Sequence, residues 1–131
     1  MLIAAIVDSQ AHHDECFALL GQPDLHILTH ALSETFSTLT GGRLGIRISA
    51  ATAADMIRQS IIPFVKTEDL SASEVLTALE QAEAHGVRGG AIYDYLHHVA
   101  ARKVNATRLY TLNISNFEHF YRTGDPQIVH P

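Results

Sequence analysis

The chain has 131 residues, a formal net charge of −5 and a pI near 5.9. Hydrophobic residues make up 47% and charged residues 18%, which excludes a disordered chain, and the scattered charges exclude a membrane span. The acidic balance argues against a surface that coats nucleic acid broadly, but it is compatible with a local basic rim around an acidic site. The single cysteine cannot form an internal disulfide and no secretory leader is recognisable, so we expect a cytoplasmic protein.

The first half of the chain alternates helical and extended patterns. Residues 1–7 are apolar on every face and have no capping residue in front of them. Turn residues such as Gly21, Pro23 and Pro63 mark where elements end. The spacing predicts, in order, a helix over 11–20, a strand over 25–29, a helix over 31–39, a helix over 49–61 and a strand over 64–65.

The second half continues the alternation. Ser71 and Glu74 form a capping-box pattern that predicts a helix up to Gly86, with Val75, Leu76, Leu79 and Ala82 as its buried stripe. A helix carrying Asp94 in its first turn follows the Gly89-Gly90 pair. The remaining elements are predicted as a strand over 108–112, a short helix with Phe117 and Phe120, and a strand over 128–129.

Strands that alternate with helices predict a parallel sheet with helices on both faces, and ligands of such sheets bind beyond the carboxyl ends of the strands. Glu34, Asp94 and Asn113 all follow predicted strands or open the helices beside them. The residue chemistry of Asp94 taken alone favours a structural acid that complements a helix end. The convergence of oxygen ligands at one edge instead favours a site for a hard cation, Mg2+ or Mn2+.

Three short motifs resemble those of the PIN-domain ribonucleases, and specifically the VapC-type toxins of toxin–antitoxin pairs. Residues 29–36 resemble the second-acid motif with Glu34, residues 86–94 the third-acid motif with Asp94, and residues 109–113 the fourth-site strand with Asn113. The resemblance implies a single PIN-like domain over 1–131, folded as a three-layer α/β/α sandwich around a central, mainly parallel sheet.

The same resemblance implies a function and partners. Glu34, Asp94 and Asn113 would be both the catalytic and the metal-binding residues of an Mg2+- or Mn2+-dependent endoribonuclease, in which the cation activates water and stabilises charge on the phosphate. Arg88, beside the glycine turn, would contact the RNA. The protein would form a homodimer, would be inhibited by a cognate antitoxin, and would have no membrane partner.

The sequence departs from the family pattern at two places. Residues 2–6 resemble the helix that follows the family's first acid, so we expect a strand ending in Asp upstream of Met1, and Asp8 does not replace it. Asn113, or alternatively Asn116, stands where many members have a fourth acid. We therefore expect an N-terminally truncated, impaired nuclease. The alternative is a catalytically degenerate PIN-like domain that binds protein or RNA and cuts nothing.

Overall fold

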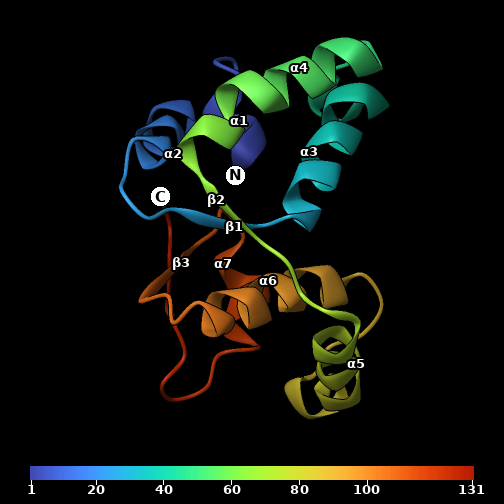
Figure 1. The fold of residues 1–131 in the computed structure, drawn as a ribbon, viewed down its shortest axis with the longest axis vertical. Helices are drawn as coiled ribbons and strands as arrows, with labels where there is room; N and C mark the ends of the chain where they lie inside the picture. Colours follow the sequence, from blue (N-terminus) through green and yellow to red (C-terminus); the bar gives the residue numbers. More distant parts are fainter. The chain divides into compact units, whose positions relative to one another are not determined.

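The structure, a computed structural model, describes all 131 residues and divides into two compact units. Unit 1 is Met1–Glu68 and unit 2 is Asp69–Pro131, and each is described by itself. In Figure 1 unit 1 runs from blue to green and unit 2 from yellow-green to red. The prediction of one domain over residues 1–131 stays a prediction.

Unit 1 places helices between and before its two strands. Ser49 caps one of these helices by accepting a hydrogen bond from the backbone N–H of Thr52, as the sequence predicts. The strands pair in parallel, with His26 opposite Lys66. The elements of unit 1 are α1 (Leu2–Ile6), α2 (His13–Leu20), β1 (His26–Leu28), α3 (His30–Gly41), α4 (Ala50–Ser60) and β2 (Lys66–Glu68), with 3-10 turns at Arg43–Gly45 and Ile62–Phe64.

The core of unit 1 joins its first helix to β1 and to the end of α4. Leu2, Ile27 and Ile61 form a buried cluster. The partly buried side chains packed against it are Ile6, Ala31, Leu32, Ile57 and Val65. Helices α1 and α2 also pack side by side (Figure 1). The apolar opening of the chain is therefore a helix whose side chains build the core, which explains why its sequence is apolar on every face.

Unit 2 begins with the predicted capping box. The Ser71 hydroxyl accepts from the Glu74 backbone N–H, and the Glu74 carboxylate accepts from the Ser71 backbone N–H. Lys103, at the other end of the next helix, donates to the Glu74 carboxylate and to the carbonyl oxygen of Asp69. The elements of unit 2 are α5 (Ala72–Gln81), α6 (Ala91–Lys103), β3 (Arg108–Tyr110), α7 (Ile114–Glu118) and β4 (Gln127–Val129), with a 3-10 turn at Glu83–His85.

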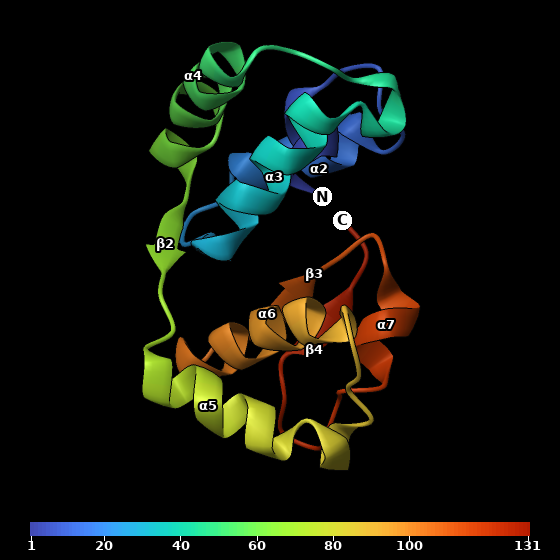
Figure 2. The same cartoon turned by 90° about the vertical axis from the view of Figure 1, so that its right-hand side faces the viewer.

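The core of unit 2 forms where α6 packs against α5, β3 and α7 (Figure 2). Its buried residues are Ala78, Val87, Tyr95, Leu109, Phe117 and Phe120. The rings of Tyr95 and Phe120 meet edge to face with centroids 5.4 Å apart, a geometry that aromatic pairs prefer. Strands β3 and β4 pair in parallel, with Leu109 opposite Ile128, and lie under this aromatic cluster through the buried Leu109.

The predicted three-layer α/β/α sandwich is wrong. The chain is 56% helical, and its strands form two separate two-stranded parallel sheets, β1 with β2 and β3 with β4. Each strand has only three residues, so each ladder is short. The alternation of helices and strands was predicted correctly. It does not determine how many strands join one sheet, because strand pairing depends on contacts between residues distant in sequence.

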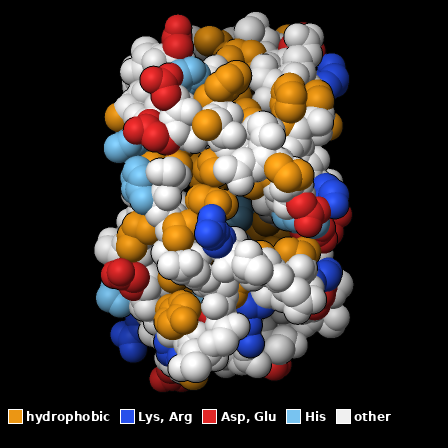
Figure 3. Space-filling model, turned by 90° about the vertical axis from the view of Figure 1, so that its left-hand side faces the viewer, with side chains coloured by type: hydrophobic (Ala, Val, Ile, Leu, Met, Phe, Trp, Pro, Cys, Tyr) orange, Lys and Arg blue, Asp and Glu red, His pale blue; other side chains and the backbone are white.

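Two local predictions are also wrong. The strand expected at 64–65 lies at Lys66–Glu68 instead, because Pro63 and Phe64 belong to a 3-10 turn. Leu76 and Leu79 are 59% and 47% exposed, so the buried side of α5 is carried by Ala78. Hydrophobic side chains accordingly reach the surface at several places on the face drawn in Figure 3.

None of the helices combines the length and apolar character that crossing a bilayer requires.

Candidate functional site

Asp94 lies in the first turn of α6, as the sequence predicts. Gly89 precedes the helix with a φ of +54°, a left-handed conformation that favours glycine, so the chain turns into α6 there. The Asp94 side chain is half-buried, and its Oδ2 accepts a hydrogen bond of 2.9 Å from Nδ2 of Asn116 on α7. The first turn of a helix also offers unpaired backbone N–H groups, whose field favours a carboxylate.

Asn113 occupies a different place from the one expected of a ligand beside Asp94. It is the residue before α7, and its Oδ1 accepts a hydrogen bond of 3.3 Å from the Ser115 hydroxyl. Its backbone N–H donates to the hydroxyl of Thr111. Asn116 lies three residues later, about one helical turn, which carries its side chain to Asp94. The structure thus brings Asn116 to the predicted acid, where the sequence analysis put Asn113 first.

Glu34 belongs to unit 1 and is part of α3, shortly after the carboxyl end of β1 as predicted. Its Oε1 lies 3.9 Å from Nε2 of His30, one turn earlier on the same helix, and both side chains are about two-fifths exposed. Arg88 belongs to unit 2, where it is exposed and directly precedes Gly89. The predicted site residues are therefore divided between the two units, with Asp94, Asn113 and Arg88 in unit 2.

The oxygen ligands can be tested against the cation that the family resemblance implies. Mg2+ and Mn2+ are held by several oxygens, usually with carboxylates among them. In unit 2 Asp94 supplies one carboxylate, and its Oδ2 already accepts an N–H from Asn116. Within neither unit do three or more His, Cys, Asp or Glu side chains form a group that could hold a metal ion. The residues of each unit, as arranged, do not fit a resident Mg2+ or Mn2+.

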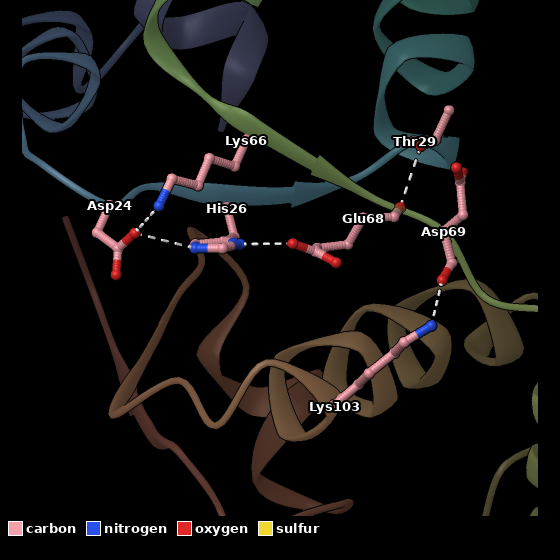
Figure 4. Close-up of polar contacts among 7 residues, drawn as sticks. All are labelled: Asp24, His26, Thr29, Lys66, Glu68, Asp69 and Lys103. Atoms are coloured by element: carbon pink, nitrogen blue, oxygen red, sulfur yellow. Dashed lines mark hydrogen bonds and ion pairs between the residues drawn. The ribbon is translucent and has the colours of Figure 1, made fainter.

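A charged network on β1 and β2 of unit 1 escaped the sequence analysis. Nδ1 of His26 lies 2.8 Å from Oε1 of Glu68, and Nε2 lies 3.3 Å from Oδ1 of Asp24 (Figure 4). Lys66 also donates to Asp24, which lowers the pKa of that carboxyl, and the contact with His26 lowers it further. Because the two ring nitrogens face different carboxylates, this network is a set of pairwise polar contacts and does not converge on one metal ion.

A signal for this network was present in the sequence. Lys66 and Glu68 are two residues apart, and this spacing puts their side chains on one face of a strand. Asp24 is two residues before His26 but lies ahead of β1, in a turn with a φ of +65°. The parallel register that sets His26 opposite Lys66 joins the two pairs. Thr29 adds a hydrogen bond of 3.0 Å from its hydroxyl to the carbonyl oxygen of Glu68 (Figure 4). The residues lie about 40 positions apart, so only the pairing of the strands reveals the contact.

A buried polar network in unit 2 was also missed. Nε2 of His98 donates to Oδ2 of Asp125 at 3.0 Å, and the side chains are 1% and 5% exposed. Asp125 accepts further from the backbone N–H of Arg122 at 2.7 Å and contacts Nε of Arg102 at 3.2 Å. Burial lowers the pKa of His98, so its ring is neutral at pH 7 and its Nδ1 is buried without a hydrogen-bond partner.

The interactions of this network stabilise the fold of unit 2. A neutral His98 can donate one proton to the carboxylate, and the remaining charge of Asp125 is balanced by Arg102. The arrangement ties α6 to the turn that precedes β4.

No family model matches this sequence, and no curated protein was found to match it. The resemblance to PIN-domain ribonucleases therefore stays a prediction that rests on the motifs around Glu34, Asp94 and Asn113.

Proposed function

We propose that the chain is an Mg2+- or Mn2+-dependent endoribonuclease toxin resembling the VapC type, with a catalytic site too weakly charged for full activity. The observation that supports the proposal most directly is the contact between Asp94 and Asn116. The third-acid motif ends at Asp94, and Asn116 follows the fourth-site strand. The third-acid motif is thus hydrogen-bonded, within one unit, to a residue three positions beyond the fourth-site motif.

The proposed roles follow from the chemistry of each side chain. Asp94 supplies a carboxylate at a half-buried helix start, where its negative charge can orient water or a hydroxyl group near a phosphate. Glu34 is the second acid. Arg88 is an exposed cation directly before the glycine turn and would contact RNA phosphate. No catalytic step is assigned to a metal ion, because the ligands in each unit do not fit one.

The experiment is an RNA cleavage assay with purified chain. Single-stranded RNA is incubated with Mg2+, with Mn2+ or with EDTA, and the products are separated on a gel. We expect slow cleavage, well below about one turnover per second, that requires the divalent cation and is lost in Asp94→Asn and Glu34→Gln. Cleavage that persists in EDTA, or that both variants retain while folded, contradicts the proposal.

A second function is favoured by the charge of the site. One carboxylate hydrogen-bonded to an amide is poorly suited to catalysis with a cation, which supports a degenerate module that binds RNA or protein without cutting. This function predicts RNA binding in a filter assay with no cleavage under any cation. The family resemblance also implies a homodimer and a cognate antitoxin, and these partners are part of the first proposal only.

A further inference from the structure

The carboxylate of Asp94 is engaged by a donor and not by a second acid. Asn116 Nδ2 lies 2.9 Å from Asp94 Oδ2, and an amide N–H can only donate to a carboxylate. A divalent cation needs lone pairs of the same oxygens. The amide donor and a cation therefore compete for Oδ2 of Asp94.

We infer that Asn116 is a positioning residue that holds the Asp94 carboxylate by its N–H and thereby lowers the affinity of this place for Mg2+ and Mn2+. This inference rests on the proposed function, in which Asp94 is the central acid. Asn116 brings no negative charge, and unit 2 holds no group of three metal-ligating acids, histidines or cysteines around Asp94. Two effects thus lower the affinity for a cation at Asp94: the amide already occupies Oδ2, and the surrounding side chains supply little negative charge.

The substitution Asn116→Asp reverses both effects. It removes the N–H donor and sets a second carboxylate close to the first, at a separation near the present hydrogen bond of 2.9 Å. Two carboxylates so close repel each other, and one of them takes up a proton or a cation to relieve the repulsion. A divalent cation is then the favoured partner, because it neutralises both charges and accepts ligands from both side chains.

Asn113→Asp is the matched control. It makes the same chemical change and the same change in net charge, and it lies three residues away. Its side chain is hydrogen-bonded to Ser115 and not to Asp94. Both asparagines are exposed, so both variants are expected to fold, which circular dichroism checks.

The experiment is a Mn2+ titration followed by electron paramagnetic resonance, in which the signal of free Mn2+ falls as the ion binds. No RNA is present. We expect wild type and Asn113→Asp to bind Mn2+ only in the millimolar range and Asn116→Asp to bind at least tenfold more tightly. Adding Asp94→Asn to Asn116→Asp should abolish the gain, because Asp94 is the other ligand.

Asn116→Ala separates competition from ligation. If the amide N–H competes with the cation, its removal raises Mn2+ affinity a few-fold. If the amide oxygen is instead a ligand, the same variant binds more weakly, and the inference is overturned. Equal gains from Asn113→Asp and Asn116→Asp, or no gain from a folded Asn116→Asp, also overturn it. RNA cleavage is measured separately, so loss of the proposed nuclease function would leave the Mn2+ result interpretable as a property of the Asp94 and Asn116 pair.

Discussion

Nε2 of His98 lies 3.0 Å from Oδ2 of Asp125, with both side chains almost fully buried in unit 2. The same carboxylate accepts from the backbone of Arg122 and pairs with Arg102. A single acid thus links the middle of α6 to the turn before β4. This link has a measurable dependence on pH, because burial lowers the pKa of His98 from its usual value.

Burial holds the pKa of His98 below its usual value of 6.5. The unfolded chain therefore takes up a proton here at a higher pH than the folded chain does. The stability that neutral His98 contributes is fully present above about pH 6.5 and is lost as the pH falls toward the lowered pKa. Urea unfolding at pH 7.5 and at pH 5.5 measures the loss.

The variant His98→Gln keeps an N–H donor for Asp125 but does not titrate. We expect its free energy of unfolding to fall less than that of wild type between the two pH values. His119→Gln, at an exposed position, is the control and should behave as wild type does. An equal pH dependence in His98→Gln and wild type would show that other groups carry it.

Asp125→Ala removes the acceptor shared by His98, Arg102 and the Arg122 backbone. The buried Nε2 of His98 loses its partner, and the contacts with Arg102 and the Arg122 backbone are lost as well, so the free energy of unfolding should fall by about 3 kcal/mol. Asp69→Ala is the matched control, because Asp69 is exposed and contributes only its backbone oxygen to Lys103. Chemical denaturation should find the control within about 0.5 kcal/mol of wild type. Similar losses in both variants would contradict the structural role of Asp125.

Ser71→Ala removes the side-chain cap of α5, in which the hydroxyl accepts from the Glu74 backbone N–H. Loss of such a cap should lower the free energy of unfolding by about 1 kcal/mol. Ser37→Ala, at an exposed position inside α3, should be neutral or slightly stabilising because alanine favours helix. The measurement is the midpoint temperature of thermal unfolding of the two variants. The prediction is wrong if Ser71→Ala unfolds at the same temperature as wild type.

Asp94→Asn keeps an oxygen that can accept from Asn116, so its free energy of unfolding should change by less than about 1 kcal/mol. It removes the negative charge, so divalent-cation-dependent RNA cleavage should disappear. The two measurements are denaturation and the cleavage assay, with Asp69→Asn as an exposed acid in the same unit for comparison. A folded Asp94→Asn that still cleaves would move the active site elsewhere.

The features predicted well are those that neighbouring residues decide. The caps at Ser49 and Ser71 need only a hydroxyl at the right distance from a backbone N–H, and both formed as expected. The sandwich was predicted wrongly because the partner of a strand is chosen by contacts across the chain, and here β1 meets only β2. Leu76 was expected inside because apolar spacing predicts a buried face, but it does not say how much of that face its neighbours cover.

The candidate site divides in the same way. The position of Asp94 at a helix start followed from the glycines before it, which is local information. The choice between Asn113 and Asn116 depended on where α7 begins, and a helix start that differs by a residue changes which side chain faces α6. The pair of His98 and Asp125 lies 27 residues apart in sequence, so no spacing within one element could reveal it.

Lys103 links the end of α6 to the start of α5, the first two helices of unit 2. Its ammonium group donates to the Glu74 carboxylate in the first turn of α5 and to the Asp69 carbonyl just before it, while its own backbone closes α6. The hydrogen bond from the Ser71 backbone N–H has the largest effect on the Glu74 carboxyl, and together with Lys103 it lowers the pKa of Glu74 to about 2. Fraying of the last turn of α6 therefore removes the Lys103 contacts from the first turn of α5. In hydrogen exchange, the amides of these two helix ends should lose protection together as one cooperative unit.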